Sequence, residues 1–102
     1  MIRDDELIER GAEIFRGLGH PSRLFIVSRL GESREMCVGE LTEMIGDDVS
    51  TVSRHLNVLR TAGIVKSEKR ANRVFYRIAL PCVFEFLACV AKSLEPKGVG
   101  NG

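Results

Sequence analysis

Apolar residues recur along this chain with two different periods, and the period changes at Gly63. Before Gly63 they recur every three or four residues, which is the spacing of amphipathic helices. After it, apolar and polar residues alternate, which is typical of strands, and a helical period then returns. The pattern predicts helices at residues 5–18, 21–30, 38–45, 49–63 and 81–94, and strands at 64–68 and 74–78 that flank a hairpin tip at 69–73.

Polar residues, proline and glycine mark where the first helices begin and end. Asp4 or Asp5 is expected to cap the first helix and Asp48 the fourth, because a carboxylate accepts hydrogen bonds from the free amides of a first turn. Pro21 suits the first turn of the second helix, where its missing N–H costs no helical hydrogen bond. Gly31 is expected to end that helix.

Other residues have conformations that the sequence predicts. Gly63 follows the fourth helix, where a residue that tolerates a positive φ is favoured. Asn72 is expected to adopt the left-handed conformation at the hairpin tip. Cys37 and Glu40 have the spacing of a capping box at the start of the third helix, and residues 32–36 before them are expected to be extended.

The helix expected at 81–94 is apolar on nearly every side. Such a helix needs partners on more than one side, so we expect it to form a dimer seam; burial within the monomer is the alternative. We expect residues 1–95 to form a single domain and residues 96–102, which are rich in glycine, to be a disordered tail.

The helix expected at 49–63 has a polar face that suits DNA. Val52, Leu56 and Leu59 form its apolar face. The polar side carries short hydrogen-bonding side chains and one guanidinium group, which can reach base edges and phosphates: Ser50, Thr51, Ser53, Arg54 and Asn57. A helix of this kind, entered by a tight turn from a short helix, is the layout of a helix-turn-helix recognition helix. An ordinary surface helix is the alternative.

Charge is distributed unevenly along the chain. The net charge is only +1, but residues 1–50 carry −5 and residues 51–77 carry +6. A local basic segment of this kind indicates binding to phosphate, whereas a solvated charged face is the alternative. Arg70 and Arg73 at the hairpin tip are expected to reach phosphates or the minor groove, and the strand lysines are weaker candidates.

Composition narrows the class of protein. The chain has 102 residues, of which 44% are hydrophobic and 28% charged, as in a globular domain. No stretch approaches the roughly 20 apolar residues of a membrane span, and the first ten residues are too charged for a signal peptide. We therefore expect a cytoplasmic protein with no membrane partner. Three cysteines in a reducing compartment favour free thiols or metal ligands over disulfides.

The expected order of elements is helix, helix, short strand, helix, helix, strand, strand, helix, which is that of a winged helix-turn-helix, mainly α with a small β-hairpin. Over residues 10–94 the sequence also resembles the ArsR/SmtB family of metal- and stress-sensing repressors. The resemblance lies in LGHPSRLFIVSRL (18–30), CVGEL (37–41), STVSRHLNVLRTAGIV (50–65) and RVFYRI (73–78). It implies a homodimer through the first and last helices, binding of a double-stranded DNA operator by two recognition helices, and release when an inducer binds.

The resemblance also implies several patterns of inducer-binding residues, and this chain completes none of them. In the arsenic pattern Cys37 keeps the first position, but Gly39 and Thr42 occupy the others. The zinc pattern of the last helix falls on Leu80, Cys82, Ser93 and Pro96. Of these four, only Cys82 has a side chain that could bind the metal. In the sulfide-responsive pattern Ser28 stands in place of the first cysteine.

The three cysteines are candidate ligands for a thiophilic ion such as As(III), Zn(II) or Cd(II), and candidates for oxidation. Cys82 and Cys89 are about 10 Å apart along one helix, too far to share an ion or a disulfide. Cys37 and Cys82 both fall at expected helix N-termini, where a thiolate is favoured, so we prefer a Cys37–Cys82 dithiol. Any site must join Cys37 to another cysteine or cross the dimer. Plain packing of each thiol among apolar side chains is the alternative.

The leading hypothesis is a dimeric DNA-binding repressor that a thiophilic ion or thiol oxidation releases from its operator. Two alternatives stay open: a winged-helix regulator without metal sensing, and a winged helix that binds protein. An enzyme is not expected, because no His, Asp or glycine-rich loop has the spacing to serve Cys37 as a nucleophile. His20 is expected to be structural, and His55 to pack or to bind phosphate.

Overall fold

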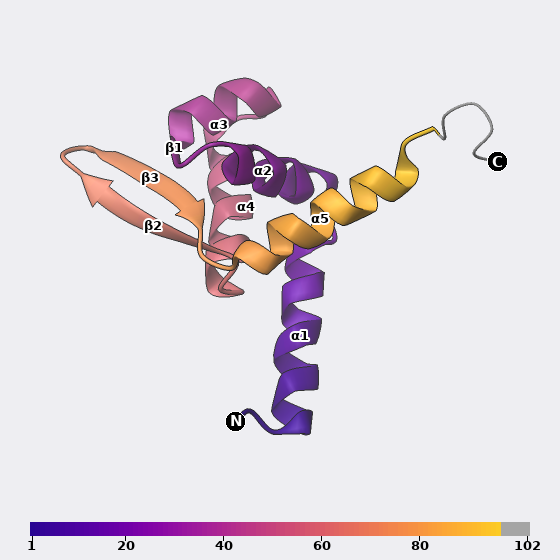
Figure 1. The fold of residues 1–102 in the computed structure, drawn as a ribbon. Coiled ribbons are helices and arrows are strands. Elements are labelled where there is room, and N and C mark those ends of the chain that lie inside the picture. Colours follow the sequence, from indigo (N-terminus) through magenta and orange to yellow (C-terminus); the bar gives the residue numbers. More distant parts are fainter. Residues whose placement is uncertain (97–102) are drawn as a thin grey trace.

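The computed structural model describes residues 1–96, and Figure 1 shows how their helices and strands are arranged. The elements of this part of the chain are α1 (Asp4–Leu18), α2 (Pro21–Glu32), β1 (Met36–Cys37), α3 (Val38–Ile45), α4 (Val49–Thr61), β2 (Val65–Arg70), β3 (Arg73–Ile78) and α5 (Pro81–Leu94). Their order confirms the winged helix-turn-helix that the sequence predicts. The tail expected at 96–102 lies, except for its first residue, outside the described residues.

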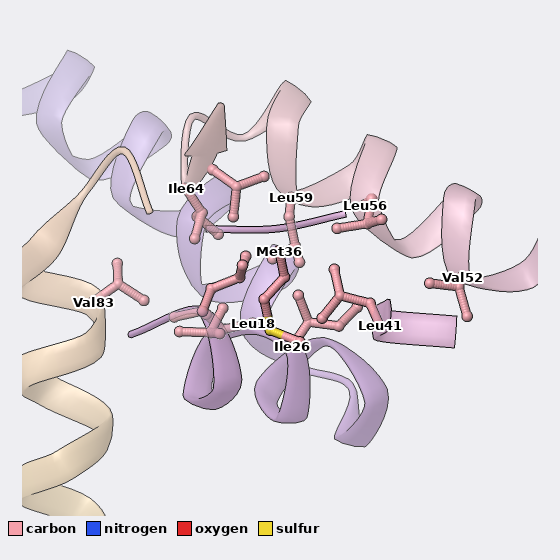
Figure 2. Close-up of a cluster of buried hydrophobic side chains, with 12 residues drawn as sticks. Leu18, Ile26, Met36, Leu41, Val52, Leu56, Leu59, Ile64 and Val83 are labelled. Atoms are coloured by element: carbon pink, nitrogen blue, oxygen red, sulfur yellow. The ribbon is translucent and has the colours of Figure 1, made fainter. Parts of the chain in front are cut away.

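The core lies where α2, α3 and α4 meet, and Figure 2 shows its buried side chains. The apolar face predicted for the fourth helix is confirmed, since Val52, Leu56 and Leu59 are fully buried. Their burial, worth about 1.5–3 kcal/mol for each side chain, turns the opposite face of α4 toward solvent. The rest of the core consists of Leu18, Ile26, Val27, Leu30, Met36, Leu41, Ile64, Val65 and Val83.

A small antiparallel sheet with strand order β1-β3-β2 joins the wing to this core. Cys37 of β1 lies opposite Phe75 of β3. In the hairpin, the pairing of β2 with β3 continues as far as Arg70 opposite Arg73. The turn therefore has only two residues, and the longer tip predicted at 69–73 is wrong.

The conformation of this tip also differs from the prediction. Ala71 has the positive φ, at 57°, and Asn72 does not. A left-handed conformation costs a residue with a Cβ about 1–2 kcal/mol. The prediction considered which side chain best tolerates this conformation, whereas the register of β2 and β3 decides which position must adopt it.

Most predicted helix ends are confirmed where local hydrogen bonds set them. Pro21 begins α2. The Asp48 carboxylate accepts from a first-turn amide of α4 at 2.7 Å, and the Glu40 carboxylate accepts from the Cys37 amide at 2.9 Å. Gly63 has a φ of +82° just beyond the end of α4.

Two helix ends differ from the prediction. Arg3, and not Asp4 or Asp5, is the N-cap residue of α1, and its side chain makes no capping hydrogen bond. The Asp5 carboxylate does accept from a first-turn amide, that of Glu6 at 2.8 Å, and it also pairs with Arg3 at 3.1 Å. The second helix continues past Gly31. A Cβ on Gly31 would lie 1.9 Å from a ring carbon of Phe84 on α5. This glycine therefore permits a close contact between two helices and does not end one.

Figure 1 shows that α1 projects away from the other helices. The helix α5 crosses the molecule beside the C-terminal end of α1. Phe15 of α1 and Phe86 of α5 are 60% and 52% exposed, and their rings meet edge to face with centroids 5.9 Å apart. An apolar hollow of about 300 Å³ lies between these two helices. Val83 is the one buried residue of α5, so the alternative of a last helix buried within the monomer is not realised.

Within residues 1–96, every helix is too short or too polar to cross a membrane.

Candidate nucleic-acid interface

The polar face of α4 lies opposite the core side chains of the same helix. Thr51 is partly buried, and the other four candidates are exposed: Ser50, Ser53, Arg54 and Asn57. Asp48 holds the N-terminal end of this face, because its carboxylate accepts from the Thr51 amide and, at 3.0 Å, from the Ser50 hydroxyl. These hydrogen bonds, the one from Thr51 first, hold the pKa of Asp48 below its ordinary value, so the cap stays ionised.

Asn57 differs from the other candidates because its amide is already engaged. Arg60, one turn further along α4, donates to Oδ1 of Asn57 at 2.7 Å. A contact between Asn57 and DNA would therefore involve Arg60 as well. Arg60 is a residue of this face that the sequence prediction missed, and its i, i+3 spacing from Asn57 is the signal that could have found it.

The two wing arginines lie close to the aromatic ring of Phe75 on β3. The guanidinium carbons of Arg70 and Arg73 are 3.9 and 5.2 Å from the ring centroid, which is the range of a cation–π contact. Arg70 also forms an ion pair with Glu35, and this hydrogen bond raises the pKa of Arg70 further. These contacts use only part of the Arg70 guanidinium group, whose five N–H donors leave others for a phosphate.

Cys37 connects the wing to the start of α3. The residue is only 5% exposed, and Nη2 of Arg73 donates to its Sγ at 3.1 Å. Hydrogen bonds from Cys37, the backbone amide first, lower the pKa of Glu40, and the charge of Arg73 adds to this effect. Cys37, Glu40 and Arg73 therefore form one polar cluster where β1 and α3 meet the wing.

The other two cysteines are exposed on α5. Cys82 lines the apolar hollow beside α1. Cys37 lies opposite Phe75, and β3 continues for about 10 Å beyond that residue before α5 begins. Cys37 is buried at the start of α3 whereas Cys82 is exposed on α5, and the Cys37–Cys82 dithiol stays a prediction. The part of the chain that the structure describes also contains no cluster of three or more His, Cys, Asp or Glu side chains that could hold a metal ion.

The two histidines lie against each other. The Ser22 amide donates to Nδ1 of His20 at 3.1 Å, so His20 caps α2 and its expected structural role is confirmed. The ring of His55 on α4 lies with its centroid 4.4 Å from that of His20, and it also contacts Arg23. His55 thus has the first of the two roles expected for it, packing within the protein.

Known proteins match the sequence of this chain. The family model described as bacterial regulatory protein, arsR family, matches residues 20–67. An uncharacterized HTH-type transcriptional regulator of Methanocaldococcus jannaschii is 40% identical over 85 residues, which are 83% of this chain and 96% of the relative. The HTH-type transcriptional repressor SmtB of Mycobacterium tuberculosis is 38% identical over 74 residues, which are 72% of this chain and 54% of that repressor.

A solved structure matches the fold. The homodimeric winged helix-turn-helix DNA-binding domain of a Mycobacterium bovis protein aligns with a TM-score of 0.81 and 27% sequence identity, over 91% of this chain and 85% of that one. These relatives are described as regulators or DNA-binding domains, and not as enzymes. Sequence and fold therefore both indicate DNA as the partner of this chain.

Proposed function

The chain belongs to the arsR family of bacterial regulatory proteins as a DNA-binding transcriptional regulator and not an enzyme, and from this premise we propose that it acts as a dimeric repressor. Two copies present their α4 helices to successive major grooves, about 34 Å apart along the DNA. The observation that carries this proposal is the polar face of α4, which the buried Val52, Leu56 and Leu59 turn outward.

The side chains of this face have different proposed roles. Arg54 reads bases, because a guanidinium group can donate two parallel hydrogen bonds to one guanine. Shorter side chains beside it bond to base edges and phosphates: Ser50, Thr51, Ser53 and Asn57. Arg70 and Arg73 of the wing contact phosphates or the minor groove, so they add affinity and register more than sequence choice.

The proposed dimer forms through α1 and α5. Phe15 and Phe86 are the centre of its apolar surface, and their exposure in one chain supports the proposal. Contiguous apolar surface of this kind marks protein interfaces. The Mycobacterium bovis domain with the same fold is itself a homodimer.

The substitution Arg54→Ala tests the role of α4. We expect it to weaken binding to DNA that the wild type selects from a random pool by about 5- to 150-fold, because one bidentate contact is worth about 1–3 kcal/mol. Arg34→Ala removes one positive charge from an exposed position between α2 and β1, outside the residues proposed for either interface, and is the matched control, with unchanged affinity expected. Weak binding that is equal for both variants and insensitive to salt would favour the alternative of a protein-binding winged helix.

We also propose that a chemical modification of the Cys37 thiol releases the protein from its operator. Its support is the contact of Sγ with Arg73, since a larger group on the sulfur would displace that wing arginine. Hydrogen peroxide can oxidise the thiol to a sulfenic acid and is itself reduced to water. A small oxidant suits a residue that is only 5% exposed. As(III), Zn(II) or Cd(II) would instead bind Cys37 together with a cysteine of α5 or of a second copy, because Cys82 and Cys89 are too far apart along α5 to share an ion.

Single serine variants separate these inducers. Operator binding is measured for the wild type, Cys37→Ser, Cys82→Ser and Cys89→Ser, with peroxide, arsenite, zinc and cadmium in turn. We expect peroxide to release every form except Cys37→Ser. An ion response that is lost in two of the variants would favour a metal site that those two cysteines share. No response in any form would favour a regulator whose cysteines only pack.

A further inference from the structure

Arg23, near the start of α2, joins three helices through one guanidinium group. Its Nε donates to the carbonyl of Gly17 at 2.6 Å, and its Nη2 to that of Arg16 at 3.4 Å. Both carbonyls belong to the last turn of α1, the negative end of that helix, where a positive side chain is stabilised. Its Nη1 lies 3.2 Å from Nδ1 of His55 on α4. Arg23 therefore ties the end of α1 to the recognition helix.

The same end of α1 also packs against the end of α4. Gly17 is buried, and a Cβ there would lie 3.4 Å from Cβ of Ala62 and 3.1 Å from the side chain of Ile64. The end of α1 thus meets α4 at two places, directly at Ala62 and through Arg23 at His55. Two separate contacts fix the rotation of one helix relative to another, which one contact alone would leave free.

The contact between Arg23 and His55 requires a neutral imidazole. An arginine side chain only donates, so Nδ1 of His55 is the acceptor and the ring proton lies on Nε2. The surroundings favour the neutral ring: burial first, then the charges of His20, Arg23 and Arg54, lower the pKa of His55, and only Asp47 opposes them. A proton on Nδ1 would remove the acceptor and set two positive groups 3.2 Å apart.

The place of His55 on α4 makes this contact relevant to DNA. His55 stands between Arg54, which is exposed, and Leu56, which is fully buried. A movement of His55 therefore moves the side chain that is proposed to read bases. At the other end of the connection, α1 is the helix proposed to form the dimer.

We propose that Arg23 is a positioning residue, which holds α4 in its DNA-binding orientation relative to α1 for as long as His55 is neutral. This inference rests on the proposed dimeric binding of an operator and adds a regulation to it. Acid removes the tie and weakens binding. The sign of this change in affinity distinguishes the proposal from a simpler one. If the His55 ring merely faced the DNA, its proton would add positive charge and strengthen binding.

The first test measures operator affinity at about pH 7.5 and about pH 5.5, a range in which histidine changes its charge. We expect the wild type to bind at least about fivefold more weakly at the lower pH, since about fivefold is the smallest effect typical of coupling between two sites. In His55→Asn the amide oxygen can accept in place of Nδ1 but does not titrate, so this variant keeps its affinity. His20→Asn retains a capping side chain for α2 and is the matched control, in which the acid-induced loss persists.

The second test removes the tie without acid. Arg23→Met keeps an apolar stem but has no donor, and we expect it to bind the operator about fivefold more weakly at neutral pH with an unchanged dimer in sedimentation. Arg23→Lys restores one donor and part of the affinity. Circular dichroism melting confirms that both variants are folded. NMR of the His55 ring nitrogens, with no DNA present, is expected to show the proton on Nε2 in the wild type.

Three results would overturn the inference: wild-type affinity in a folded Arg23→Met, stronger binding of the wild type in acid, or a ring proton on Nδ1. A wild type that binds no DNA in any salt would refute the proposed function and this inference with it. The NMR measurement tells the two failures apart, because it reports on the Arg23–His55 contact alone.

Discussion

Single side chains on and beside the wing keep its two arginines in place. Arg70 and Arg73 lie beside Phe75, and their other partners are Glu35 and Cys37. These contacts restrict both guanidinium groups before any DNA is present. Ordering them on a phosphate therefore costs less side-chain entropy than ordering two free arginines would.

At the wing tip, one residue adopts a conformation that its side chain disfavours. Ala71 has a φ of 57°, and a glycine would adopt it without the Cβ clash. We expect Ala71→Gly to raise the free energy of unfolding by about 1 kcal/mol, measured by urea denaturation. Asn72→Gly is the matched control at a position without a positive φ, where no gain is expected. Equal unfolding midpoints for Ala71→Gly and the wild type would contradict this account of the turn.

The stability of the protein should also depend on pH through His55. Its pKa is lowered in the folded protein, so below the ordinary histidine value of about 6.5 the unfolded chain binds a proton more readily than the folded one. The contribution of the neutral ring is complete above that value, and it is lost as the pH falls from there through the lower pKa of the folded protein. We expect the urea midpoint to fall over this range, and to fall less in His55→Asn. An equal fall in both would show that His55 does not contribute.

At the scale of elements, α2 and α5 approach each other more closely than a side chain on Gly31 would allow. We expect Gly31→Ala to lower the free energy of unfolding by about 1–3 kcal/mol, because Phe84 must move. Gly11→Ala in α1 is the control: no atom lies within 4 Å of the added Cβ, so it should stabilise the helix by about 1 kcal/mol. If both substitutions change the urea midpoint similarly, helix propensity alone determines their effect on stability, and the contact with Phe84 contributes nothing.

The elements themselves could be predicted because their periodicity is a local property of the sequence. Every predicted helix and hairpin strand is present, with ends that agree within two residues. The differences arise where a distant residue decides. Phe84 explains why Gly31 lies inside α2, and strand register explains why Ala71 has the positive φ.

Less of the candidate site could be predicted, because most of it joins distant parts of the chain. The polar face around Arg54 belongs to one helix and follows from spacing alone. The ion pair of Arg70 with Glu35 spans 35 residues, and no local pattern indicates it. The Cys37–Cys82 dithiol stays a prediction for the same reason: helix ends indicate where a thiolate is favoured, but not the distance between two such ends.

At the scale of the whole molecule, the wing and the two terminal helices extend from the core in different directions (Figure 1). This arrangement leaves the apolar surface of α1 and α5 free for a second copy while α4 and the wing stay available to DNA. A domain of about 100 residues buries a limited share of its surface, so a dimer would also add stability.

We expect Phe86→Arg to convert the dimer to a folded monomer, because this side chain is 52% exposed in one chain and would face its counterpart's apolar surface in a dimer. Sedimentation velocity measures the association, and circular dichroism the fold. Met44→Arg, at a 48% exposed position of α3, is the matched control and should remain a dimer. A dimer that tolerates Phe86→Arg would exclude this part of α5 from the interface.

The central claim is that two copies of this chain read DNA with paired α4 helices. Selection of binding sequences from a random DNA pool tests it most directly, with binding by Arg54→Ala measured on the sequences that emerge. We predict an inverted repeat whose half-site centres are about 10 base pairs apart, or a multiple of that, and reduced binding by the variant at the conserved bases. Selected sequences without a repeat, or a repeat bound equally well by Arg54→Ala, would contradict the claim.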